Sequence, residues 1–113
     1  MELQYSELEN DIRQIKLVGQ LDINGVGMIE TKFTGYCAGE NPRVLVDLSE
    51  VHFLASIGIR LLTLNAKSIV SRGGRMVLVG AIPEVKSVLE VTGISAIIPM
   101  YDGFESAETI LLQ

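Results

Sequence analysis

Tryptophan is absent from this 113-residue chain, and aromatic residues make up only 5% of it. The chain therefore lacks the rows of aromatic side chains on which single-stranded nucleic acids stack. Lys and Arg number 9 against 14 Asp and Glu, which gives a formal net charge of −5. Because such a surface repels phosphate backbones and no basic cluster offsets it, we expect no nucleic-acid partner.

Cysteine and histidine are equally scarce. The only cysteine, Cys37, excludes an internal disulfide and fits a reducing compartment. The only histidine, His52, has no partner at a metal-ligand spacing, so we expect a structural or surface role for it and no metal or other cofactor. No apolar run approaches the ~20 residues of a membrane span, and the N-terminus lacks the features of a signal peptide. We expect a cytoplasmic protein that makes no contact with a membrane.

What the chain does have is aliphatic patterning. The stretches 3–5 and 15–21 carry apolar residues at every second position, which predicts an antiparallel hairpin. Val44–Leu48 is a continuous apolar run, typical of a strand buried on both faces of a sheet. The further expected elements are a helix over 26–37, a helix from 59 to about 73, a strand over 75–79, a helix from 83 to about 92, a short strand at 97–98 and a closing helix from 104.

Two details of the C-terminal region follow from single residues. Pro99 cannot donate to a sheet, so the strand at Ile97–Ile98 is expected to be short and to lie at an edge. Asp102 and Glu105 have the spacing of an acidic capping pattern for the closing helix. Helices that link successive strands imply parallel pairing. The sequence therefore predicts a single α/β domain over residues 1–113, with a mixed, partly parallel sheet of about five strands and four α-helices.

Ser56 falls where the helix after the buried strand begins. A helix start exposes unpaired N–H groups and the positive end of the peptide dipoles, so a serine there can cap the helix and an anion there is stabilised. The ordinary role of such a serine is the cap, and the alternative is a phosphate acceptor. Gly58 leaves the first turn without a side chain, which would give a partner backbone or a nucleotide phosphate room to approach.

Residues Asp47–Ile59 resemble the signature of the anti-sigma-factor antagonists, the STAS domain family. In that signature a strand ending D-L-S is followed by an F-[ILM]-D-S-S-G-[LI] turn into a helix. The resemblance continues in the same order along essentially the whole chain. Gly19–Asp22 is similar to the family's G-E-L-D turn, Gly73–Val79 to its R-G-G-x-L-V-L strand and Pro83–Gly93 to its P-x-V-x-x-x-L-x-x-T-G helix.

The resemblance implies a site. A partner kinase phosphorylates the first serine of the family's D-S-S-G turn, and that serine matches Ser56. The chain departs from the pattern at Ala55, where the family has Asp, and at Ile57, where it has a second Ser. The first change removes a carboxylate that can position the hydroxyl or a metal-bound nucleotide. The second leaves Ser56 as the only hydroxyl in the turn.

The neighbours of Ser56 have competing interpretations. Asp22 matches the last residue of the G-E-L-D turn, which would place it on the surface beside the serine, but a turn aspartate also commonly caps the next segment. Ile57 is either an unremarkable exposed side chain or an anchor for a partner. Asp47, at the end of a buried strand, is expected to bond nearby backbone N–H groups.

The function that the resemblance implies is a binding module of bacterial signal transduction and transcription regulation, not an enzyme. Unphosphorylated, the chain would dock on an anti-sigma factor or similar ATP-binding serine kinase through Asp22, Ala55, Ser56, Ile57 and Gly58, and the partner held by that kinase would be released. Phosphorylation would weaken docking, and a serine phosphatase would restore it. Two alternatives stay open: a nucleotide-binding protein that uses the Asp22 and Ser56 surface as a pocket, and a constitutive scaffold that does not switch.

Overall fold

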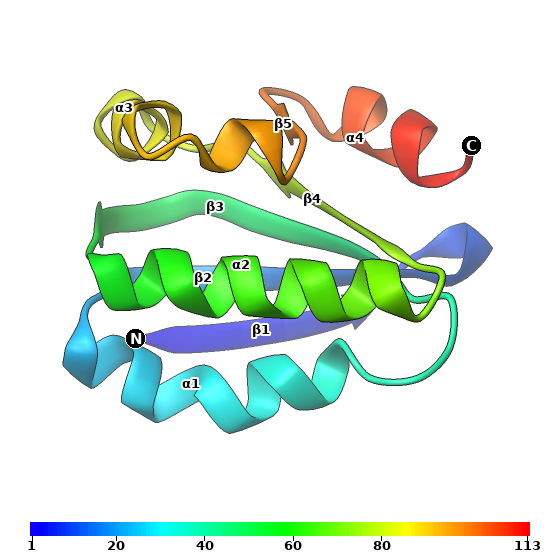
Figure 1. The fold of residues 1–113 in the computed structure, drawn as a ribbon, viewed down its shortest axis with the longest axis horizontal. Coiled ribbons are helices and arrows are strands. Elements are labelled where there is room, and N and C mark those ends of the chain that lie inside the picture. Colours follow the sequence, from blue (N-terminus) through cyan, green and yellow to red (C-terminus); the bar gives the residue numbers. More distant parts are fainter.

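Five strands form one sheet in the spatial order β1-β2-β3-β4-β5, so strands that follow one another in the chain lie side by side (Figure 1). The computed structural model describes all residues, 1–113. β1 (Glu2–Glu7) pairs antiparallel with β2 (Ile12–Leu21), as the hairpin prediction requires. β3 (Arg43–Leu54), β4 (Arg75–Val79) and β5 (Met100–Tyr101) continue the sheet with parallel pairing. The predicted mixed α/β fold is confirmed.

Three of the four helices cover one face of the sheet. α1 (Ile23–Tyr36), α2 (Ser56–Ser71) and α3 (Pro83–Val91) each link two neighbouring parallel strands. Because such crossovers are right-handed and the sheet grows in one direction, all three fall on the same side. Their buried residues, among them Phe33, Leu62 and Leu89, join a single cluster of 22 core residues. No helix combines the length and the hydropathy of a membrane span.

The opposite face is covered only in part. α4 (Phe104–Leu111) packs there on β3, β4 and β5, and its Ala107 and Leu111 belong to a cluster of 6 buried residues. Within β3, Val44 and Val46 face the larger cluster and Leu45 faces the smaller one. The continuous apolar run is therefore buried on both faces, as predicted.

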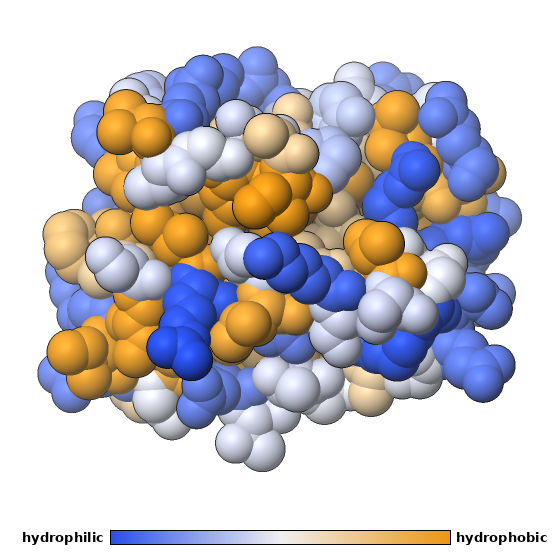
Figure 2. Space-filling view, in the orientation of Figure 1, coloured by the Kyte–Doolittle hydropathy of each residue, from blue (hydrophilic) through white to orange (hydrophobic).

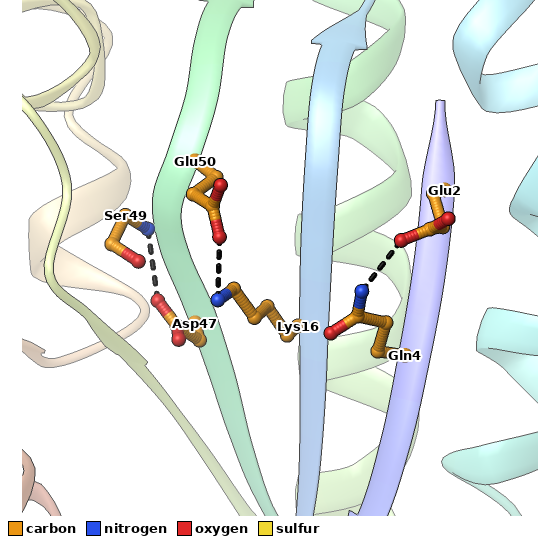
Figure 3. A network of polar contacts seen from close by, with 6 residues as sticks. All are labelled: Glu2, Gln4, Lys16, Asp47, Ser49 and Glu50. Carbon is orange, nitrogen blue, oxygen red and sulfur yellow. Dashed lines mark hydrogen bonds and ion pairs between the residues drawn. The ribbon is translucent and has the colours of Figure 1, made fainter.

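Over β1 and β2 the second face has no helix and is polar. Lys16 of β2 reaches across to Glu50 of β3, with 2.5 Å between Nζ and Oε2 (Figure 3). This contact lowers the pKa of the Glu50 carboxyl, because the ammonium donates a hydrogen bond to the carboxylate. Asp47 Oδ1 accepts a hydrogen bond of 2.9 Å from the Ser49 backbone N–H, which confirms the structural role expected for that aspartate.

The strand predicted at Ile97–Ile98 is wrong. A 3₁₀ turn at Ile94–Ala96 precedes this segment, Ile97 and Ile98 continue it as an irregular turn, and the Ile98 amide donates a hydrogen bond of 2.8 Å to the carbonyl of Ile94. β5 begins only after Pro99, whose carbonyl accepts a hydrogen bond of 2.9 Å from the Leu78 amide. A proline that supplies only an acceptor can stand at the start of a strand, so the chain enters the sheet there. β5 is nonetheless short and lies at the edge, as expected.

The capping pattern predicted for the last helix is also wrong. Gly103 occupies the N-cap position of α4, and no side chain caps that helix. Asp102 lies one residue too early, and its Oδ1 is 3.6 Å from the ammonium of Lys86 on α3. Pro83, by contrast, stands at the first position of α3, where its missing N–H costs no hydrogen bond.

Candidate functional site

The predicted site residues lie where β2 and β3 end and the next helices begin. Leu21 and Leu54 are paired in the sheet, and the Ala55 amide donates a hydrogen bond of 3.0 Å to the carbonyl of Leu21. Asp22 directly follows Leu21 in the chain, and Ser56 directly follows Ala55. The sheet therefore brings the starts of α1 and α2 together at one edge, the edge at which α/β proteins commonly bind their ligands.

Ser56 is the first residue of α2, and it is exposed. The N-cap position is occupied by Ala55 in an extended conformation, and no side chain caps the helix. The interpretation of Ser56 as a cap is therefore wrong, because only the non-helical residue before the first turn directs its side chain to the free amides. The hydroxyl stands at the positive end of the α2 dipole without a structural task.

Asp22 is the N-cap of α1. Its Oδ1 accepts a hydrogen bond of 2.7 Å from the Gly25 amide, so the capping role is confirmed. The side chain is half-buried, and one carboxylate oxygen is committed to the helix. Contact of Asp22 with a partner stays a prediction.

Gly58 is buried, and the explanation given for it from the sequence is wrong. A Cβ at this position would lie 2.8 Å from Leu54 Cδ1 and 2.9 Å from both Leu21 Cβ and the Leu21 carbonyl oxygen. The glycine therefore lets the first turn of α2 pack against the ends of β2 and β3. The space it leaves is filled by the chain itself, not by a partner.

Exposed apolar side chains lie on the segments that meet at this edge. Ile57 is 36% exposed and Ile23, at the start of α1, is 74% exposed. Phe53, near the end of β3, is exposed as well. Sequence reasoning missed Ile23 and Phe53. Ile23 carried a signal, since it lies off the apolar stripe of α1, whereas Phe53 is directed outward by a register shift between β2 and β3 that the sequence does not mark.

A groove runs between α1 and α2 from this edge. Its volume is about 460 Å³, and its lining residues are Glu30, Thr34, Ile57, Arg60, Leu61, Leu64, Asn65 and Ser68. The main cavities of the fold are lined by neither Asp22 nor Ser56. The nucleotide-pocket alternative therefore has no hollow at these two residues to support it.

Other reactive side chains contribute nothing to this edge. His52 is exposed on β3, and no three His, Cys, Asp or Glu side chains converge so as to hold a metal ion. Cys37 is buried beyond the end of α1, and burial raises the pKa of its thiol to about 12. A thiol of that kind is not a nucleophile near neutral pH.

Comparison with known proteins agrees with this geometry. The family model described as STAS domain matches residues 6–107. A relative from Bordetella bronchiseptica, BtrV, described as an anti-sigma factor antagonist, is 34% identical over 65 residues, which are 58% of this chain and 56% of that protein. The chain thus aligns with a little over half the length of that relative.

Solved structures share the fold over nearly the full chain. An anti-sigma-factor antagonist (STAS) domain protein from Planctomyces limnophilus has a TM-score of 0.86 and 26% identity, with 98% of each chain covered. The Bacillus cell fate determinant SpoIIAA, solved in its phosphorylated form, has a TM-score of 0.71 and 20% identity, covering 99% of this chain and 100% of the other. The second likeness shows a common fold.

Proposed function

Because this chain belongs to the STAS domain family, we propose that it is an anti-sigma-factor antagonist whose docking is switched by phosphorylation of Ser56. Unphosphorylated, it binds an anti-sigma factor that is also an ATP-binding serine kinase, and the protein held by that kinase is released. A serine phosphatase reverses the modification. We take residues 1–113 as one domain, since β1 and α4 extend beyond the matched residues 6–107 and pack on the same sheet.

The proposal rests mainly on one observation: Ser56, in the first turn of α2, is exposed and its hydroxyl does not cap the helix. A kinase can reach it without opening the fold. A phosphate adds about −1.5 to −2 charges at a helix start whose free N–H groups and dipole favour an anion. The phosphorylated domain therefore keeps its structure, and the added charge changes its affinity for the partner.

The neighbouring side chains define the docking surface. Ile57 and Ile23 offer apolar area beside the serine, and Asp22 offers a half-buried carboxylate. A phosphate buried against a partner that provides no cation is repelled and loses its hydration, which weakens docking by a few kcal/mol. The switch thus acts through desolvation and charge at one edge of the sheet.

The test is phosphorylation in vitro followed by mass spectrometry. Paired affinity capture, with the wild-type chain and Ser56→Asp as baits, identifies a kinase that only the wild-type chain retains. That kinase, purified and supplied with ATP, is expected to add one phosphate at Ser56 and none to Ser56→Ala. Equal labelling of Ser56→Ala, or retention of the same kinase by both baits, would refute the switch. Capture of the kinase without phosphate transfer to Ser56, in cells or in vitro, would favour the constitutive scaffold.

A further inference from the structure

The α1–α2 groove begins at Ile57, directly beside the phosphate acceptor, and runs away from it. On α2 its lining extends from Ile57 to Ser68. Eleven residues at 1.5 Å each span about 16 Å, or three helical turns. α1 and α2 lie next to each other along this length (Figure 1). The groove is therefore long enough to receive a short helix.

The α2 wall of the groove carries three apolar residues, Ile57, Leu61 and Leu64, beside the polar Arg60, Asn65 and Ser68. Leu64 is 54% exposed, Ile57 is partly exposed, and Leu61 is buried between them at helical spacing. Figure 2 shows hydrophobic surface broken by hydrophilic residues over the face on which α1 and α2 lie. An apolar ridge of this kind matches the spacing of side chains on a second helix.

Beside the groove, α1 has a glycine that the fold does not require. Gly27 lies inside α1, and a Cβ there would meet no atom within 4 Å. Glycine in a helix interior costs about 1 kcal/mol relative to alanine. Gly27 lies about one turn before Glu30, on the side of the helix that also carries Ile23 and Thr34, so its missing side chain leaves open space beside the groove.

Each wall also presents an unpaired charge. Glu30 lines the groove from α1 and Arg60 lines it from α2. The two ion pairs of the protein, Lys16–Glu50 and Lys86–Asp102, include neither of them. A ligand with one basic and one acidic group beside an apolar stripe complements both walls, whereas a purely apolar segment leaves both charges without a partner.

We propose that an amphipathic helix of the anti-sigma factor lies in the α1–α2 groove, with its apolar stripe on Ile57 and Leu64, a basic residue toward Glu30 and an acidic residue toward Arg60. This inference rests on the proposed function, because the occupant belongs to the same partner. It divides the interface into a part at Ser56, which phosphorylation modifies, and a part along the groove that extends away from it. Leu64 lies eight residues from Ser56, about 12 Å along the helix.

The first test substitutes one exposed leucine. Leu64→Glu is expected to weaken binding of the captured kinase, measured by calorimetry without ATP, about tenfold, which corresponds to 1.4 kcal/mol. Val70→Glu is the matched control, since Val70 is 64% exposed on the same helix but does not line the groove, and its affinity is expected to equal that of wild type. Equal affinity of Leu64→Glu and wild type would overturn the inference.

Two further variants examine the α1 wall and the charges. Gly27→Leu places a good helix former in α1 and adds a bulky side chain beside the groove, so about tenfold weaker binding is expected. Glu30→Lys is expected to weaken binding severalfold, with a larger loss at low salt, because an attraction becomes a repulsion. A groove with no occupant predicts no change in either variant, and that result would exclude the helix.

The failure of this inference is distinguishable from failure of the proposed function. If wild type is phosphorylated at Ser56 and binds the kinase, but Leu64→Glu binds it equally well, only the groove assignment fails. If wild type neither binds nor accepts phosphate, both fail. A photoreactive residue at position 64 identifies the occupant directly. Cross-links to a helix of the kinase support the inference, and cross-links to an extended loop or to a second copy of this chain overturn it.

Discussion

The backbone amide of Ala55 donates a hydrogen bond of 3.0 Å to the carbonyl of Leu21, which ties the start of α2 to the end of β2. Gly58 packs on the same leucine from one turn further along α2. The residue that follows Leu21 caps α1, and the residue that follows Ala55 is the candidate phosphate acceptor. The serine is thus held by backbone contacts, so its own side chain is free for modification.

Substitution of Asp22 is expected to destabilise the fold more than substitution of Ser56, because only Asp22 caps a helix. Asp22→Ala is expected to lower the free energy of unfolding by about 1 kcal/mol, because the Gly25 amide loses its acceptor. Ser56→Ala is expected to change it by less than about 0.5 kcal/mol, since no side chain caps α2. Urea unfolding of both variants measures the contrast. A loss at Ser56→Ala as large as that at Asp22→Ala would mean that the hydroxyl caps α2 after all.

Two glycines are expected to respond to alanine with opposite signs. Gly58→Ala forces a Cβ against Leu54 and Leu21 and is expected to cost about 1–3 kcal/mol. Gly27→Ala meets no neighbour within 4 Å and is expected to stabilise the fold by about 0.5–1 kcal/mol, through helix propensity. Thermal unfolding of the pair checks both signs. Destabilisation by Gly27→Ala would reveal an internal packing role that the geometry does not contain.

Phosphorylation of Ser56 is expected to stabilise the isolated domain slightly. The phosphate adds negative charge at the start of α2, and Arg60 lies four residues later on the same helix, the favourable order for an i,i+4 ion pair. The expected gain is about 1 kcal/mol at low salt. Thermal unfolding of phosphorylated wild type and phosphorylated Arg60→Ala separates the two effects. A phosphate that lowers the stability of both proteins would exclude a preformed anion site.

Stability is expected to fall above pH 8.5 because of Cys37. Burial raises the pKa of this thiol to about 12 in the folded chain, whereas an unfolded cysteine ionises near 8.5. Between these values only the unfolded chain loses the proton, so the contribution is complete below pH 8.5 and declines as pH rises, by up to ~1.4 kcal/mol per pH unit. Denaturant titrations of wild type and Cys37→Ala from pH 8 to 9.5 measure the difference. Parallel pH profiles for the two proteins would show that the thiol ionises without unfolding.

Ala55 is expected to slow phosphate transfer. Ala55→Asp restores a carboxylate next to the hydroxyl at the N-cap position, where aspartate is also a preferred residue. We expect faster labelling of Ser56 by the captured kinase and a gain of about 1 kcal/mol in stability. Initial rates with ATP, followed by intact-protein mass spectrometry, measure the first effect. An unchanged rate in a more stable protein would assign position 55 to capping alone.

Much of the fold followed from short-range patterns. Period-two alternation predicted β1 and β2, the unbroken run Val44–Leu48 predicted a strand buried on both faces, and Pro83 marked the start of α3. The failures occurred where a local pattern competed with the sheet. The Ile98 side chain is buried in the core although its backbone lies in a turn. The last strand begins only after Pro99, whose carbonyl accepts a hydrogen bond from the Leu78 amide.

For the site, the sequence by itself determined that a lone hydroxyl follows a buried strand at a helix start. Only the tertiary structure decided that Ser56 does not cap its helix, that Gly58 serves the packing of its own chain, and that Glu30 and Arg60 lie on opposite walls of one groove. The physical reason is the sequence separation of the residues that interact. Helix starts and apolar periods depend on neighbours a few residues away, whereas caps, close approaches and grooves depend on how β2 and β3 bring two separate helices side by side.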